Sequence, residues 1–157
     1  MPTDLSVDSC YNSFVMILIS GGTGFIGNVL IRHLVDLGHP IKLLIRPSKT
    51  SPNLPKGFPL EIAISSLGDE KGLRAAMKDV DTIYHLASAE SLGRKASLTE
   101  VDIQGTQTLI EVASQAKVNR IVFLSHLGAD RASAFPLLKS KGIAEHYIKE
   151  SGIPYTI

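Results

Sequence analysis

The sequence has one cysteine, no tryptophan and few aromatic residues. The single cysteine, Cys10, cannot form an intrachain disulfide, and it cannot build a zinc site made of several cysteines. No apolar run approaches the ~20 residues that a helix needs to span a bilayer. The N-terminus lacks the basic start and the apolar core of a signal peptide. We therefore expect a cytoplasmic protein with no membrane span and no metal site.

An excess of charge of either sign is also lacking. Lysine and arginine number 16, aspartate and glutamate 15, and the formal net charge is +1. This balance leaves no excess of positive charge of the kind that binds nucleic acid. The 157 residues are 44% hydrophobic, which suffices for one substantial core. Because the first residues are polar and aperiodic, we expect a flexible tail over 1–14 and one domain over 15–157.

Residues 15–27 are the stretch around which the rest of the chain is organised. An apolar run ends there in four glycines, and a helical pattern follows at once. A short apolar run bounded by glycine indicates a strand buried on both faces. After it, apolar residues recur at helical spacing, namely Phe25, Ile26, Val29, Leu30, Leu34 and Leu37.

A strand, a glycine turn and a helix in this order predict a phosphate cradle for a dinucleotide. The glycines fit two registers, one beginning at Gly22 and one at Gly21, and both include Gly24 and Gly27. The first glycines allow a tight turn, the next lets backbone approach a pyrophosphate, and Gly27 lets the helix pack closely on the strand. The free N–H groups of the helix then face the phosphates.

The remaining sequence alternates strands with helices. Strands are expected at 41–45, 60–64, 80–88, 119–125 and 154–157, and helices near 23–37, 70–77, 98–116 and 138–151. This alternation predicts an α/β, Rossmann-like doubly wound parallel sheet of order 3-2-1-4-5-6 with helices on both faces. Its ligand crevice lies above the ends of the first and fourth strands.

Arg46, at the end of the second expected strand, bears on the choice of cofactor. An NAD-specific unit carries an Asp or Glu there, which holds the ribose 2′-hydroxyl. No acid stands at this place, whereas a guanidinium can grip a 2′-phosphate. Arg46 therefore favours NADP(H) over NAD(H), and the alternative is a solvated arginine at a strand end.

Several segments together resemble the atypical, extended short-chain dehydrogenase/reductase superfamily. The resemblance covers nearly all of 16–157 and is carried by the glycine motif at 20–27 and by the segments 81–87, 105–106, 120–125, 127–130, 139–141 and 152–157. Within this superfamily the sequence resembles the nucleotide-binding accessory subunit of respiratory complex I and the NmrA-like proteins, of the NAD-dependent epimerase/dehydratase type. The resemblance implies a bound nicotinamide dinucleotide and a small-molecule substrate.

By this resemblance, the cofactor-binding residues lie at the ends of several strands. The expected set is Gly21, Thr23, Gly24, Phe25, Ile26 and Gly27 at the pyrophosphate, Arg46 at the 2′-phosphate, Ser66 and Leu67 at adenine, and Ala87, Ser88 and Lys141 at the ribose and nicotinamide. For Lys141 the alternative is a surface lysine on an amphipathic helix.

The catalytic positions of the superfamily are only partly filled. In relatives a Ser, a Tyr and a Lys move a proton to or from the substrate oxygen. Ser125 matches the serine and Lys141 the lysine, but Leu137 stands at the tyrosine position. Ser125 fits equally well as a strand-end serine that satisfies backbone groups. His85 is expected to be a strand side chain rather than a catalytic base.

Two further positions depart from the superfamily's pattern. Ser66 stands where relatives carry an Asp that bonds adenine, so adenine recognition is expected to be weaker. Asp102 stands where relatives carry an Asn, and we expect it to be a solvated helix residue; the alternative is a negative charge near the site of an anionic cofactor.

Relatives continue past the sixth strand into a substrate-binding part, so we expect that part to be absent here. We also expect a second copy or a partner chain at the exposed sheet edge. Two classes of function remain open. One is an oxidoreductase or epimerase/dehydratase-like enzyme; the other is a non-catalytic nucleotide-binding module, such as a redox sensor or an assembly subunit, or an inactive fragment.

Overall fold

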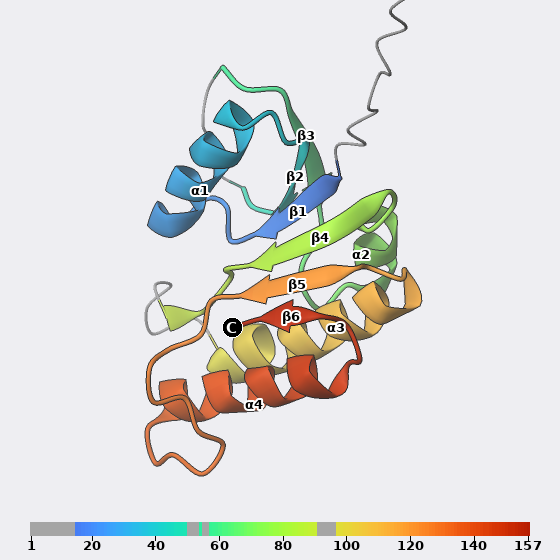
Figure 1. The fold of residues 1–157 in the computed structure, drawn as a ribbon. Helices are drawn as coiled ribbons and strands as arrows, with labels where there is room; N and C mark the ends of the chain where they lie inside the picture. The colour runs from blue at the N-terminus through green and yellow to red at the C-terminus, as the bar shows by residue number, and fades with distance from the viewer. Residues whose placement is uncertain (1–14, 50–53, 55–56, 91–96) are drawn as a thin grey trace, which may run out of the picture.

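The computed structural model describes residues 15–49, 54, 57–90 and 97–157 (Figure 1). The predicted tail over 1–14 lies outside the described residues, as do residues 50–53, 55–56 and 91–96. In chain order the elements are β1 Met16–Ser20, α1 Phe25–Asp36, β2 Ile41–Ile45, β3 Leu60–Ile64, α2 Glu70–Ala76, β4 Val80–His85, the π-helix η2 Thr99–Gly105, α3 Thr106–Gln115, β5 Arg120–Phe123, α4 Pro136–Glu150 and β6 Tyr155–Thr156.

The six strands form one parallel sheet in the order β3-β2-β1-β4-β5-β6, which confirms the predicted topology. β1 lies in the middle and is almost wholly buried, as its continuous apolar run predicted. In register with β1, Ser20 lies beside Leu44 of β2 and His85 of β4. The carboxyl ends of these strands therefore meet at one edge of the sheet.

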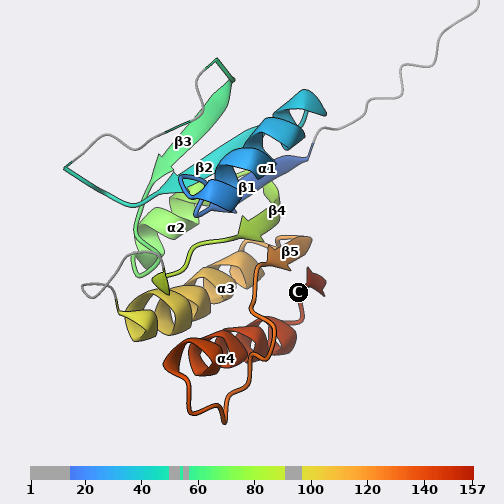
Figure 2. The same cartoon turned by 90° about the vertical axis from the view of Figure 1, so that its left-hand side faces the viewer.

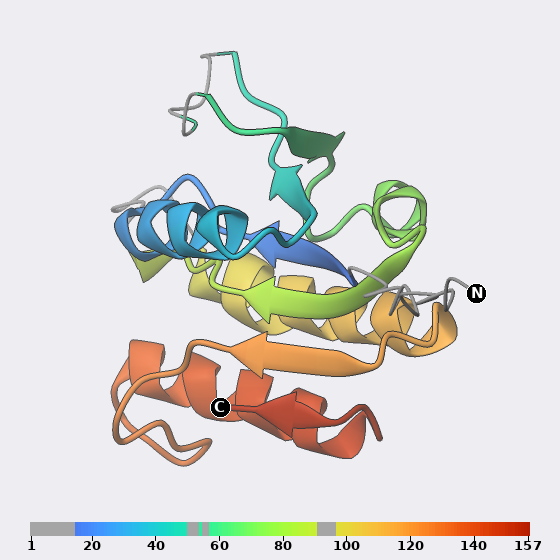
Figure 3. The ribbon, with the colours of Figure 1, turned by 45° about the horizontal axis from the view of Figure 1, so that its top comes forward.

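Helices cover both faces of the sheet, but unequally over the described residues. α1 lies on one face, while α2, α3 and α4 lie on the other (Figures 1 and 3). Each face has its own buried core: one gathers around Ile19, Ile31 and Leu43, and the other around Leu18, Ile83, Leu109 and Ile121. α3 and α4 pack side by side along the second face (Figure 2).

The buried side of α1 differs from the one that the sequence indicated. The helix buries Gly27, Ile31 and Leu34. Four of the residues at the predicted apolar spacing are exposed instead: Phe25, Ile26, Val29 and Leu37. The buried stripe of this helix is therefore narrow, and Phe25 and Ile26 in its first turn are exposed to solvent.

The long helix predicted over 98–116 is divided in two. Its first part is the π-helix η2, and regular α-helix begins only at Thr106. At the junction, a Cβ on Gly105 would lie 2.8 Å from the Cβ of Leu67, so this backbone packs directly against the loop after β3. Asp102, within η2, lies in the interior at 2% exposure. Elsewhere the expected cap of α2 is confirmed, because the Asp69 side chain accepts the Gly72 N–H.

Over the described parts of the chain, every helix is too short or too polar to span a bilayer.

The unequal burial along α1 gives a direct test of the fold. Ile31 is fully buried, so Ile31→Ala should lower the free energy of unfolding by about 2–5 kcal/mol. Val29, two residues away on the same helix, is 57% exposed, and Val29→Ala should change it by no more than about 0.5 kcal/mol. Urea denaturation of both variants measures the difference, and equal losses would contradict the observed face.

Candidate functional site

The turn after β1 is built from backbone that lies too close to its neighbours for side chains. Gly21 adopts a φ of +77°, and a Cβ there would lie 2.5 Å from the amide nitrogen of Ala87. Gly27, inside α1, would place a Cβ 2.5 Å from the carbonyl oxygen of Gly21. Glycine at both positions thus lets α1 and the loop after β4 close on the turn from two sides.

The start of α1 leaves donors open at this turn. Gly24 is the residue that precedes the helix, and no side chain caps the first N–H groups. Thr23, Gly24, Phe25 and Ile26 are all exposed. Unpaired N–H groups at the positive end of a helix dipole attract anions, so this turn has the geometry of a phosphate site.

The other predicted cofactor residues lie at the ends of neighbouring strands. Arg46 directly follows β2 and is exposed, Ser66 and Leu67 follow β3, and Ala87 and Ser88 follow β4, all four half-buried. All five therefore share the carboxyl edge of the sheet with the glycine turn. The structure brings them to one edge, and their contacts with a nucleotide stay predictions.

Asp102 is not the solvated residue that the sequence led us to expect. Its Oδ1 lies 3.0 Å from the Nζ of Lys141, and its Oδ2 accepts the N–H of Ala89 at 2.8 Å. The Lys141 contact is an ion pair rather than a directed hydrogen bond. Both side chains are at least 95% buried. The prediction failed because Asp102 lies on the buried side of the helix, beside a lysine 39 positions later in the chain that a reading of the local sequence does not bring to it.

Lys141 is likewise no surface lysine. Its ammonium lies 5.2 Å from the centre of the Phe123 ring, a cation–π distance, as well as beside Asp102. Its predicted roles at the ribose and in catalysis remain predictions. Leu137, at the tyrosine position, lies half-buried in the first turn of α4.

Ser125 bonds a partner other than Lys141. Its hydroxyl donates to Oε1 of Glu145 at 2.6 Å, and Oε2 of Glu145 pairs with Lys149 at 2.9 Å. Burial acts to raise the pKa of Glu145, but the hydrogen bonds from Ser125 and Lys149 and the charge of Lys149 outweigh it, so this pKa lies below its usual value. The predicted catalytic role of Ser125 stays untested, but its hydroxyl is already engaged.

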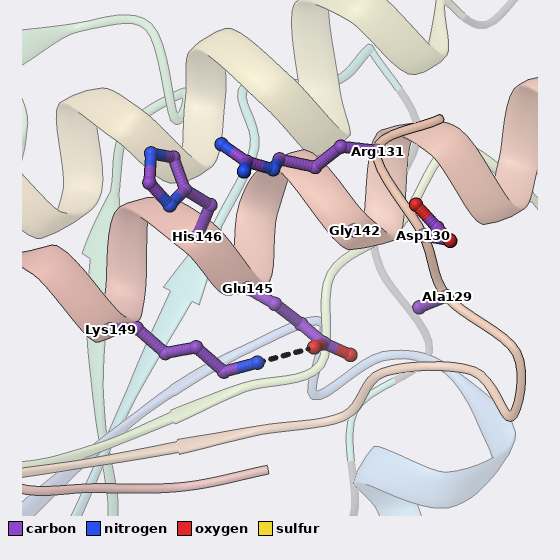
Figure 4. Close-up of a pocket in the computed structure, with 7 residues that line it drawn as sticks. All are labelled: Ala129, Asp130, Arg131, Gly142, Glu145, His146 and Lys149. Carbon is purple, nitrogen blue, oxygen red and sulfur yellow. Dashed lines mark hydrogen bonds and ion pairs between the residues drawn. The ribbon is translucent and has the colours of Figure 1, made fainter. Parts of the chain in front are cut away.

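A hollow beside this pair is lined by Ala129, Asp130, Arg131, Gly142, Glu145, His146 and Lys149 (Figure 4). It lies between α4 and the loop that precedes it, and the Glu145–Lys149 pair crosses its floor. None of the predicted nucleotide-binding residues lines it. It is therefore separate from the glycine turn.

The sequence analysis missed the partners of His85. This side chain, fully buried, bonds the Ser20 hydroxyl at 2.6 Å and the Thr106 hydroxyl at 2.9 Å. It also stacks on the Phe123 ring. Burial, helped by the charge of Lys141 and opposed by that of Asp102, lowers the pKa of His85 to about 3. The imidazole is therefore neutral and ties β1, β4 and α3 together under the glycine turn.

Comparison with known proteins agrees with this geometry. A family profile described as NAD(P)H-binding matches residues 21–157. The chain belongs to the NAD(P)H-binding family.

Relatives of this NAD(P)H-binding chain include proteins with quite different names. The photosystem II assembly factor Ycf39 of Cyanophora paradoxa is 28% identical over 90% of this chain and 43% of its own length. A 3β-hydroxysteroid dehydrogenase/Δ5→4-isomerase of Mycobacterium tuberculosis is 32% identical over 69% of this chain and 31% of its own. Among solved structures, the Bordetella bronchiseptica enzyme WbmG in complex with NAD superposes with a TM-score of 0.75 at 25% identity, over 94% of this chain and 53% of that one.

The chain thus spans less than half the length of these curated relatives and about half of the solved one. The fold and the sequence together make it an NAD(P)-binding Rossmann domain of the short-chain dehydrogenase/reductase and epimerase type. The residues present fit the dinucleotide, because the exposed, uncapped glycine turn is the part of the domain that receives a pyrophosphate.

The buried neutral imidazole of His85 should make stability depend on pH. In the unfolded chain His85 takes up a proton below about pH 6.5, whereas in the folded chain it stays neutral to about pH 3. The unfolded state therefore binds more protons as pH falls, and the folded state loses stability. Between about pH 7 and pH 5 this group alone should lower the free energy of unfolding by about 2 kcal/mol.

Urea denaturation across this range should show a smaller decline for His85→Gln than for the unmodified chain. The matched control is the same substitution at an exposed histidine, His126→Gln. An equal decline of the free energy of unfolding with pH in all three proteins would show that His85 takes up a proton in the folded state as it does in the unfolded state.

Proposed function

We propose that this chain binds NADP(H) at the glycine turn and acts as a nucleotide-binding module that does not transfer hydride through the Ser–Tyr–Lys route. The observation that carries the proposal is the open turn from Gly21 to Gly27 at the sheet edge, joined there by Arg46. In this proposal the backbone of Thr23 to Ile26 holds the pyrophosphate. The nucleotide, when bound, supplies a redox-active nicotinamide, and its pyrophosphate and 2′-phosphate are the negative charges that these residues would hold.

The preference for NADP(H) rests on the end of β2. Arg46 is exposed immediately after this strand, and no acidic residue directly follows the strand to hold a ribose 2′-hydroxyl. A guanidinium there binds a 2′-phosphate through a charge-assisted pair and has no such partner in NAD(H). Arg46 thus supports the choice of the phosphorylated cofactor.

The non-catalytic part of the proposal rests on the state of three positions. Leu137 has no proton to give, the ammonium of Lys141 is committed to Asp102, and the hydroxyl of Ser125 is committed to Glu145. A proton-transfer group must reach the substrate oxygen, and none of the three side chains is free to do so. The name of the relative Ycf39, an assembly factor, is in keeping with a binding role.

The second candidate is an NADP(H)-dependent oxidoreductase or epimerase/dehydratase-like enzyme. It is favoured by the 32% identity to a hydroxysteroid dehydrogenase/isomerase. In that case a proton donor outside the usual triad acts on a small carbonyl or sugar-like substrate, and turnover separates the two candidates.

Calorimetric titration tests the cofactor. The unmodified chain should bind NADPH more tightly than NADH, and Arg46→Ala should weaken NADPH binding about tenfold or more while leaving NADH within about twofold. Arg32→Ala, an exposed arginine on α1, is the matched control and should change neither affinity. Equal affinities for the two cofactors would overturn the role of Arg46.

A panel of carbonyl and sugar-nucleotide substrates tests the absence of hydride transfer. With the unmodified chain, NADPH absorbance should stay constant and the sugar nucleotides, incubated with either NADP⁺ or NADPH, should be recovered unchanged, because no free acid reaches the substrate oxygen. Leu137→Tyr restores the hydroxyl, and activity that appears only in this variant would support the binding module, with Leu137→Phe as its control. Substrate-specific turnover by the unmodified chain would establish the enzyme instead.

A further inference from the structure

Asp102 is a buried carboxylate that the proposed function does not use. Of its two oxygens, one meets the Lys141 ammonium at 3.0 Å and the other accepts the Ala89 N–H at 2.8 Å. These contacts join three segments that are distant in sequence: the loop after β4, the π-helix η2 and the helix α4. A single side chain therefore fixes the relative position of all three.

Each of the two contacts of Asp102 satisfies a buried group that would otherwise lack a partner. Ala89 is 4% exposed, so its N–H has no access to water and requires an acceptor within the protein. The Asp102 carboxylate is itself buried and requires a cation, which Lys141 supplies from the neighbouring helix. The ammonium thus neutralises the carboxylate, and the carboxylate holds the backbone amide.

The loop held in this way is a wall of the glycine turn. Its first residue, Leu86, donates its N–H to the Ser20 carbonyl oxygen at 3.0 Å. The backbone of Leu86 and Ala87 fills the space where Gly21 would carry a Cβ. The Ala89 amide comes two residues after Ala87. Its hydrogen bond to Asp102, here called the Ala89 anchor, therefore fixes the position of the loop just beyond the glycine turn.

We propose that Asp102 is a positioning residue for the nicotinamide half of the site, which it shapes by holding the Ala89 amide, and that Lys141 serves it as a counter-ion. This inference rests on the proposed binding of NADP(H). The adenosine half lies at the ends of β2 and β3, where Arg46, Ser66 and Leu67 follow the strands. Loss of the Ala89 anchor should therefore affect the two halves of the nucleotide differently.

Two double variants isolate the anchor. Asp102→Asn with Lys141→Met removes both charges and leaves an amide oxygen that can accept the Ala89 N–H. Asp102→Leu with Lys141→Met removes both charges and also the acceptor, at nearly the same side-chain size. Neither leaves an unpaired buried charge, and the two chains differ at residue 102 alone, where asparagine can accept the Ala89 N–H and leucine cannot.

Calorimetry with NADPH and with adenosine 2′,5′-bisphosphate, which carries only the adenosine half, gives the first readout. The leucine double variant should bind NADPH about tenfold or more weakly than the asparagine double variant. Both should bind the bisphosphate within about twofold of the unmodified chain. A purely structural role would move both ligands together or neither, and either result would overturn the proposal.

Amide hydrogen exchange by NMR gives a second readout that needs no ligand. The Ala89 amide should exchange about tenfold or more faster in the leucine double variant than in the asparagine one, because it has lost its acceptor. If the unmodified chain bound neither ligand, the proposed function would fail. The exchange rate would then decide the anchor alone, and equal Ala89 rates in the two variants would overturn it.

Discussion

The structure depends on one steric constraint, the close approach of two backbones at the carboxyl edge of the sheet. Gly21 and the loop that begins at Leu86 lie so near that a single Cβ would collide with the amide of Ala87. Gly27 imposes the same limit on α1 from the other side. Because backbone alone forms the turn and no side chain caps the first N–H groups of α1, the turn is suited to phosphate oxygens rather than to a packed side chain.

Beneath this edge the protein buries several polar and charged side chains that contact one another. His85 joins two hydroxyls on β1 and α3, and Asp102 joins the β4 loop to α4 through Lys141. Phe123 lies between the two groups, stacked on His85 and below the ammonium. Buried polar groups must be satisfied by partners at fixed distances, so these contacts define geometry more than they add stability. Together these contacts hold in place the strand ends that carry the glycine turn.

The residues that the resemblance aligns with the serine and lysine of the superfamily also have partners inside the protein. Lys141 is paired with Asp102, and Ser125 is hydrogen-bonded to Glu145. A shared residue type at a shared position therefore does not imply a shared role, because the partner that each side chain meets decides what it can do.

The sequence by itself determined the sheet order, the glycine turn and the placement of Arg46, Ser66 and Ala87 at strand ends. These follow from local signals: apolar runs, glycine spacing and the alternation of strands with helices, which allows few topologies. Only the tertiary structure decided that Asp102 is buried, that Lys141 is its counter-ion, that His85 has two hydroxyl partners and that Val29 faces solvent. Each of these depends on contacts between segments that lie far apart in the chain. Periodicity along one helix carries no information about the partners that packing brings to it.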